Sequence, residues 1–125
     1  MADARQDYKI GTKARFAPLE LIDVASIRAE AGDQWTNEVL TRVNDSVVRL
    51  GVVQGEFHWH KHDHDDEFFY CIDGELFVDI ESGPTFTLGP HQGVTVPKGV
   101  VHRTRAPTRT SMLMVETTEI VAIGD

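Results

Sequence analysis

Apolar and polar residues alternate with a period of two over most of the chain, which indicates β-strands that bury one face. The alternation predicts strands at residues 37–43, 46–54, 67–72, 75–81, 85–88, 93–96, 101–106 and 111–118. Short strands separated by turn residues at this spacing are typical of an antiparallel sandwich or barrel. We therefore expect an all-β fold.

One short helix is predicted before the strands. Asp23 can cap a helix over Val24–Ala31, and Gly32 can end it. Residues 1–15 carry little periodicity and are expected to form a loose arm. The chain has 125 residues, 41% of them hydrophobic, which is enough for one core. We divide it into an arm at residues 1–22 and a single domain at residues 23–125 that includes the helix.

Turn residues and side-chain faces refine this prediction. Asn44-Asp45 is expected to close one hairpin, and Asp73-Gly74 suits the positive φ of a type I′ turn. Alternation puts Phe77 and Asp79 on the outer face of their strand. Phe77 and Trp35 then need a cover, and the candidates are a partner subunit or the N-terminal arm. Arg49 shares one face of its strand with Val47 and Gly51.

The charge balance excludes some partners. The net charge is −8, with 20 acidic against 12 basic residues, whereas nucleic acids and anionic membranes attract clustered Lys and Arg. We therefore expect no nucleic acid and no membrane as partner. Arg103, Arg105 and Arg109 form the one dense basic stretch, which we interpret as a solvated strand face, with phosphate binding as the lesser alternative.

Cysteine usage and the N-terminus favour a cytoplasmic location. Cys71 is the single cysteine, so no intramolecular disulfide forms, and its apolar neighbours suggest a buried small hydrophobe. The N-terminal residues include no apolar signal-peptide segment, and no apolar run approaches the ~20 residues of a membrane span.

Histidines and a glutamate predict a metal site on this scaffold. Four histidines stand at every second position, at His58, His60, His62 and His64, and Glu67 and His102 follow. On a strand, His60 and His62 would point to the same face, and imidazoles with a carboxylate are ligands for first-row divalent metals. A divalent ion held by His60, His62, Glu67 and His102 would carry a net charge of about +1 and, if octahedral, keep two open positions. Open positions favour a catalytic site over a structural one.

These residues stand in two motifs that resemble those of the cupin superfamily. The first motif is present as Gly55-x4-His60-x-His62-x4-Glu67-x6-Gly74, and the second as Pro97-x-Gly99-x-x-His102. The chain departs from the family pattern in the four-residue gap after Gly55, in His91 at the leading glycine of the second motif, and in Ala106 at its final asparagine. The local texture is similar to small single-domain cupins of the mannose-6-phosphate-isomerase-like group.

The resemblance implies a double-stranded β-helix in which His60, His62, Glu67 and His102 bind one divalent transition metal, namely Fe, Mn, Ni or Zn. It also implies a homodimer. The expected function is that of an enzyme acting on a small anionic molecule, with a dioxygenase slightly preferred over an isomerase or lyase. The alternative from another class is a non-enzymatic metal- or metabolite-binding module.

Several residues near the motifs keep more than one interpretation. His58 and His64 are each a surplus ligand, a partner of a ligand or a solvent-facing residue, and His91 is interpreted as an exposed turn residue. Asp63, Asp65 and Asp66 are interpreted as turn residues, one of which can orient a ligand imidazole. Residues that can line a cavity wall if their faces turn inward are Gln54, Phe69, Cys71, Met112 and Met114.

Overall fold

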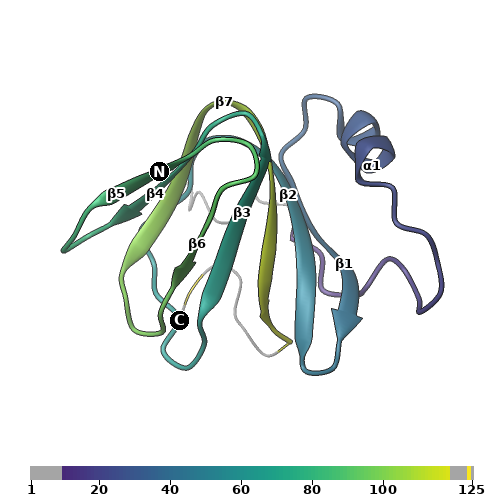
Figure 1. Ribbon diagram of the computed structural model, residues 1–125, viewed down its shortest axis with the longest axis horizontal. Coiled ribbons are helices and arrows are strands. Elements are labelled where there is room, and N and C mark those ends of the chain that lie inside the picture. The colour runs from purple at the N-terminus through teal and green to yellow at the C-terminus, as the bar shows by residue number, and fades with distance from the viewer. Residues whose placement is uncertain (1–9, 119–123, 125) are drawn as a thin grey trace, which may run out of the picture.

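Strands dominate the computed structural model, which describes residues 10–118 and 124 (Figure 1). The elements in chain order are α1 (Val24–Ala31), β1 (Thr36–Val43), β2 (Ser46–Glu56), β3 (Glu67–Asp73), β4 (Leu76–Ile80), β5 (Thr85–Leu88), β6 (Gly93–Val96) and β7 (His102–Thr117). All of the paired strands are antiparallel. The predicted all-β class is confirmed.

β7 joins the two layers of sheet. Its first residues pair with β4, which in turn pairs with β5, and its later residues lie between β2 and β3 in the order β1-β2-β7-β3-β6. Figure 1 shows β7 arching over the top from one layer to the other. This arrangement is the double-stranded β-helix that the resemblance implies, and its interior lies between the layers.

The two strands predicted at residues 101–106 and 111–118 are wrong in one respect, because they form a single strand. Gly55 pairs with Ala106 and Val53 pairs with Thr110, so Gln54 alone faces residues 107–109. Pro107 lies in this bulge, where its missing N–H costs no ladder hydrogen bond. The break in the alternation therefore marks a bulge within β7 rather than a turn between strands.

The hairpin predicted at Asp73-Gly74 is also wrong, although the positive φ is present. Gly74 has φ 84°, and a Cβ there would clash with the side chain of Thr110. β3 and β4 do not pair with each other; each pairs with β7, so the dipeptide carries the chain from one layer to the other. The hairpin at Asn44 is confirmed, since Val43 pairs with Ser46 and Asn44 has φ 54°.

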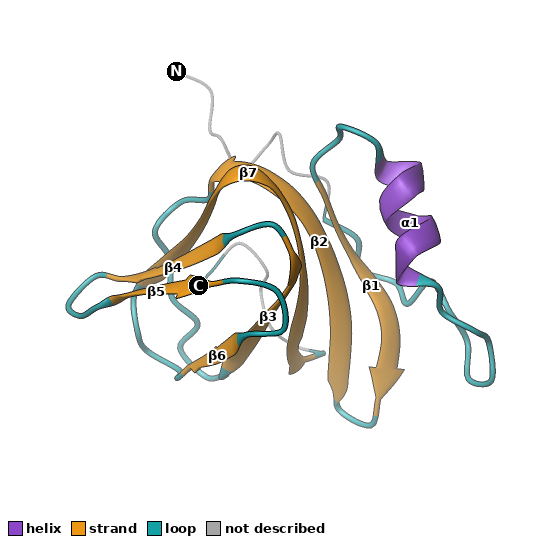
Figure 2. Ribbon diagram, turned by 45° about the horizontal axis from the view of Figure 1, so that its top comes forward, coloured by secondary structure: helices purple, strands orange, loops and turns teal. Residues whose placement is uncertain are grey.

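The helix forms as predicted and covers the outside of the sheet. The Asp23 carboxylate accepts a hydrogen bond from Ser26 N, and Gly32 follows the last turn with φ 56°. Figure 2 shows α1 beside β1, outside the barrel. An outer core lies there, built from Ile27, Leu40, Leu50 and Val52. The inner core between the layers consists of Val53, Phe69, Cys71, Leu76, Val78, Leu88, Val96, Ala106, Met112 and Met114.

The described part of the N-terminal arm, residues 10–22, is tied to β1. Gly11 N donates to Asn37 O at 2.7 Å, and Arg15 N and Phe16 N donate to the carbonyls of Val39 and Leu40, both at 3.0 Å. The arm therefore covers an edge strand that would otherwise expose its backbone. Residues 1–9 of the predicted loose arm lie outside the described residues.

The two aromatic residues expected to need a cover from a partner subunit or from the N-terminal arm contact other parts of their own chain. Trp35 is half-buried against the inner core and stacks on Phe57, with ring centroids 6.1 Å apart. Phe77 is half-buried, and the Arg105 guanidinium lies 4.3 Å from its ring centroid. These residues no longer argue for a homodimer.

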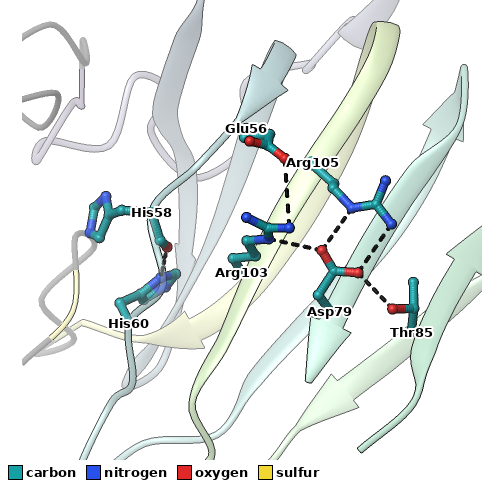
Figure 3. A network of polar contacts seen from close by, with 7 residues as sticks. All are labelled: Glu56, His58, His60, Asp79, Thr85, Arg103 and Arg105. Carbon is teal, nitrogen blue, oxygen red and sulfur yellow. Dashed lines mark hydrogen bonds and ion pairs between the residues drawn. The ribbon is translucent and has the colours of Figure 1, made fainter. Parts of the chain in front are cut away.

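The outer face of β4 holds a buried carboxylate instead of a solvated one (Figure 3). Asp79 accepts hydrogen bonds from Arg105 Nε at 2.7 Å, Arg103 Nε at 2.9 Å and Thr85 Oγ1 at 2.7 Å. The Arg105 bond is the main reason that the pKa of Asp79 falls to about 2. Arg109 donates to Gln34 O, so all three arginines of the basic stretch contact other groups of the chain.

Cys71 is fully buried, and burial raises the pKa of its thiol. This confirms its interpretation as a core residue. Within the described residues, the chain contains no helix whose length and apolar character would let it span a membrane.

Candidate metal centre

The histidine segment is not a strand, contrary to the expectation for His60 and His62. β2 ends at Glu56, and residues 57–66 are irregular except for one bridge between His60 and His102. That bridge is made by His60 N to His102 O at 2.9 Å and by His102 N to His60 O at 2.8 Å. The segment thus runs antiparallel to the start of β7, which brings the two parts of the predicted site together.

The acidic turn residues fix this segment to the strands around it. Asp65 accepts a hydrogen bond from Thr117 Oγ1 at 2.6 Å, and Asp66 accepts one from Lys98 N at 2.9 Å. The carbonyl of His62 accepts a bond from Gly99 N at 2.8 Å, so the Pro97–Gly99 turn is held against the segment. These contacts agree with the interpretation of the aspartates as turn residues, and they position His62 and Glu67 on either side of the turn.

The four residues predicted as ligands lie together. His60, His62, Glu67 and His102 each offer one ligand atom, and these atoms all lie within 4.8 Å of one another. Glu67 Oε1 lies 3.3 Å from Nε2 of both His62 and His102. Glu67 is the first residue of β3 and His102 the first of β7, and both side chains are buried, as is His62.

Backbone carbonyls orient two of the imidazoles. His60 Nδ1 lies 2.9 Å from the carbonyl of His58, and His102 Nδ1 lies 2.9 Å from the carbonyl of Val100. Because a carbonyl oxygen only accepts, each Nδ1 carries the proton, and each Nε2 keeps a lone pair. Metal-binding histidines are commonly oriented in this way. The donor set therefore fits a divalent cation.

The charges of these groups agree with that fit. Burial lowers the pKa of His60 to about 4, so its imidazole is neutral at pH 7. Burial opposes the charged form of Glu67, but its close contacts with the imidazoles of His102 and His62 outweigh burial and hold the pKa of this carboxyl well below its usual range. A neutral His60 imidazole beside the anionic Glu67 carboxylate matches the protonation states that metal binding requires.

A buried Arg49–Glu116 pair beside the centre was missed as part of the site. The Arg49 guanidinium contacts the Glu116 carboxyl group, and Arg49 Nη1 donates to Gly11 O at 2.9 Å and Asn37 Oδ1 at 3.3 Å. Glu116 interacts with Glu67; burial and then this neighbouring carboxyl raise the pKa of Glu116 to about 9. The sequence signal that could have revealed Glu116 is its position, because it stands an even number of residues from Met112 and Met114 on β7 and therefore faces inward with them.

A narrow cavity of about 30 Å³ reaches the centre at His60 and Glu67. Its other lining residues are Trp35, Asn37, Val53, Gly55, Phe57, Phe69, Thr104, Arg105, Met112, Met114 and Glu116. Of the residues expected as possible wall, Phe69, Met112 and Met114 line this cavity. Gln54 is exposed, and Cys71 lies in the inner core.

The remaining histidines lie outside the four-residue group. His58 is half-buried, and its ring stacks on Phe57 with centroids 4.3 Å apart. His64 is exposed. His91 is exposed in a turn with φ 69°, as predicted, and its Nδ1 lies 3.0 Å from the hydroxyl of Tyr70.

Comparisons with known proteins agree with this fold. The family model described as "Cupin domain" matches residues 46–118. The chain is 39% identical over 94 residues to "Uncharacterized protein YdbB" of Bacillus subtilis (strain 168), which covers 75% of this chain and 83% of that protein. A cupin-2 domain containing protein from Shewanella frigidimarina superposes with a TM-score of 0.72 at 28% identity, over 78% of this chain and 94% of that one. A protein from Neisseria meningitidis superposes with a TM-score of 0.69 at 26% identity, over 78% of this chain and 99% of that one. The chain belongs to the cupin family.

Proposed function

We propose that this cupin binds one divalent transition metal through His60, His62, Glu67 and His102 and acts on a small organic molecule. The observation that carries the proposal is the convergence of four ligand atoms within 4.8 Å of one another, with two imidazoles oriented by backbone carbonyls. The cavity that reaches His60 and Glu67 gives a small molecule access to the same centre. Fe, Mn, Ni and Zn all suit this donor set.

The chain's own groups determine which molecules are favoured. When bound, the metal supplies a Lewis acid and a template for oxygen-containing ligands. Three neutral imidazoles and one carboxylate leave a divalent site at about +1, which favours a molecule that binds as a monoanion. Glu67 is a poor general base here, because its neighbouring imidazoles already stabilise the anionic form. Its role is charge balance.

Among reaction classes we prefer a dioxygenase slightly, since three histidines and a glutamate with open positions suit Fe²⁺ and O₂. An isomerase or lyase is the close alternative, because Lewis-acid chemistry at the same donor set needs no O₂. A non-enzymatic metal- or metabolite-binding module is the alternative from another class.

The test loads the metal-free protein separately with Fe²⁺, Mn²⁺, Ni²⁺ and Zn²⁺ and screens small carboxylates and 1,3-dicarbonyls while recording O₂ uptake. Turnover that consumes O₂ and is restored by Fe²⁺ alone supports the dioxygenase. Equal turnover without O₂ supports the isomerase or lyase. Tight binding without turnover under every metal supports the binding module. A His102→Ala variant controls for adventitious metal chemistry.

The quaternary state and location are further proposals. A homodimer is supported by the exposed apolar loop before α1, where Leu19 is 107% and Leu21 is 89% exposed. A sedimentation experiment that finds only the 14.0 kDa species at micromolar concentration overturns it. A cytoplasmic location rests on the expectations from cysteine usage and the N-terminus, and localisation of the tagged protein tests it. The division into an arm at residues 1–22 and a domain at residues 23–125 is tested by limited proteolysis.

A further inference from the structure

The walls of the cavity are apolar for most of its depth. Val53 and Phe69 belong to the inner core, and Met112 and Met114 project from β7 into the same space. Phe57 adds an aromatic ring at the end of the cavity that also holds Trp35. A ligand that reaches the centre at His60 and Glu67 must therefore place the rest of its body against hydrocarbon, aromatic and thioether groups.

Several of the polar groups that line the cavity contact other parts of the chain, although neither buried carboxyl oxygen of Glu116 has a hydrogen-bond partner among the described residues. The Asn37 side-chain oxygen accepts from Arg49, and the Glu116 carboxyl lies between Arg49 and Glu67. The Arg105 guanidinium is bonded to Asp79 on the outer face of the sheet. Thr104 adds one hydroxyl to the lining. Away from the ligand group, the hydrogen-bonding partners that the lining offers to a ligand are thus mainly the Glu116 carboxyl and the Thr104 hydroxyl.

We propose that the substrate is a compact molecule with a chelating oxygen pair at one end and an apolar body, such as an aromatic ring or a branched hydrocarbon, at the other. This inference rests on the proposed function, since the oxygen pair is assigned to the metal. It disfavours sugars and sugar acids, which carry a hydroxyl on almost every carbon. Each hydroxyl that gives up water without a new partner is expected to lower affinity about tenfold.

Three α-hydroxy carboxylates test the inference, because they share one chelating monoanionic end and differ in the body. Glycolate has no body, mandelate carries a phenyl ring, and gluconate carries a chain of hydroxyls. Their affinities are measured by calorimetry on protein loaded with Zn²⁺, which is redox-silent. We expect mandelate to bind at least about tenfold more tightly than glycolate, and gluconate no more tightly than glycolate. Gluconate binding as tightly as mandelate, or no difference among the three, overturns the inference.

A matched pair of variants on β7 tests whether the preference for mandelate comes from the apolar wall of the cavity. Met112→Gln puts an amide into the cavity, whereas Val115→Gln changes a residue on the opposite face of the same strand that is 37% exposed. Met112→Gln should reduce the advantage of mandelate over glycolate about fivefold or more while Zn²⁺ affinity stays unchanged. Val115→Gln should change neither. A preference that survives Met112→Gln overturns the assignment to this wall.

Failure of the proposed function gives a different result. The direct Zn²⁺ titration comes first, and a protein that binds no Zn²⁺ contradicts the metal centre itself. A protein that binds Zn²⁺ but does not prefer mandelate contradicts the substrate class alone. The two claims therefore fail separately.

Discussion

Two buried carboxyl groups with arginine partners, Asp79 and Glu116, lie in this small barrel and differ in what surrounds them. Asp79 is 5% exposed and Glu116 4%, so their burial is nearly equal. The pKa of Asp79 is lowered to about 2, whereas that of Glu116 is raised to about 9. Burial alone therefore does not decide the charge of a carboxyl group in this protein.

The partners explain the difference. Asp79 on the outer face accepts from Arg103, Arg105 and Thr85, and the bond from Arg105 contributes most. Glu116 on the inner face has one guanidinium partner and, on another side, the carboxyl group of Glu67. The cluster around Asp79, the outer cluster, thus links β4, β5 and β7. In the inner cluster the Glu67 carboxylate disfavours a second negative charge, so Glu116 keeps its proton beside the anionic Glu67.

The largest effect on metal affinity is expected from a substitution within the ligand group itself. His102→Ala removes one imidazole of the proposed donor set and should lower metal affinity by about a hundredfold or more, since even indirect partners of ligands account for 10–100-fold. Isothermal titration with Zn²⁺ measures it. His91→Ala, at an exposed turn, is the control and should leave affinity unchanged. Wild-type affinity in His102→Ala contradicts the proposed ligand set.

A substitution in the outer cluster should lower stability and leave metal binding unchanged. Asp79→Asn removes the charge that satisfies two partly buried guanidinium groups, and we expect a loss of about 2–3 kcal/mol in the free energy of unfolding. Urea denaturation of the metal-free protein measures the loss, and Zn²⁺ titration provides the contrast. A variant that loses metal affinity but not stability reverses the comparison between the two regions.

The dependence of stability on pH below pH 5 gives a second test of the role of Asp79. The folded pKa of Asp79, about 2, is below the ordinary value of 3.8, so its contribution is fully present above pH 4 and is lost as the pH falls toward 2. Asp79→Asn should flatten the dependence of stability on pH in this range. Denaturation midpoints at closely spaced pH values between 2 and 5 show the change, and an unchanged dependence on pH contradicts it.

The contribution of Glu116 to the stability of the metal-free protein should depend on pH in the opposite direction to that of Asp79. Its folded pKa of about 9 is above the ordinary value of 4.5, so the folded state holds a proton that the unfolded state has released. Its contribution to stability is present below pH 4.5 and decreases as the pH rises toward 9. Glu116→Gln keeps the shape and should reduce this decline. A variant with the same slope as the wild type between pH 5 and 9 contradicts the proton assignment.

The smallest effect is expected at His64, which is exposed and lies outside the ligand group. His64→Ala should change metal affinity by less than about twofold, because it removes no bond to the proposed metal. Competition with a chromogenic chelator is sensitive enough to measure this. If His64→Ala strips the metal while His62→Ala retains it, the assignment of His62 and not His64 is wrong.

The four-residue group could be predicted from the sequence because its members stand in two short motifs whose spacing limits the possible geometry. The helix could be predicted for a similar reason, since Asp23 and Gly32 are local signals. The irregular path of residues 57–66 could not, because alternate histidines look the same in a strand and in an extended loop that meets β7 at one bridge. What aligns these side chains is the long-range contact with His102.

Long-range pairing also explains the other errors. Pro107 interrupts the alternation, and only the partner strand β2 shows that the interruption is a bulge within one strand. Arg49 and Glu116 have ionisable side chains, and such residues are rarely buried unless they are paired. Their partners lie far along the chain, 67 positions apart for this pair, so local patterning contains little information about them.

The metal content of the protein tests the central claim most directly. Protein purified without an affinity tag or chelator is analysed by elemental mass spectrometry, and the metal-free form is titrated with Zn²⁺ beside a His60→Ala/His102→Ala variant that retains wild-type circular dichroism. The account predicts about one divalent ion per wild-type chain and almost none in the variant. No tight divalent metal in the wild type, or full occupancy of the variant, contradicts it.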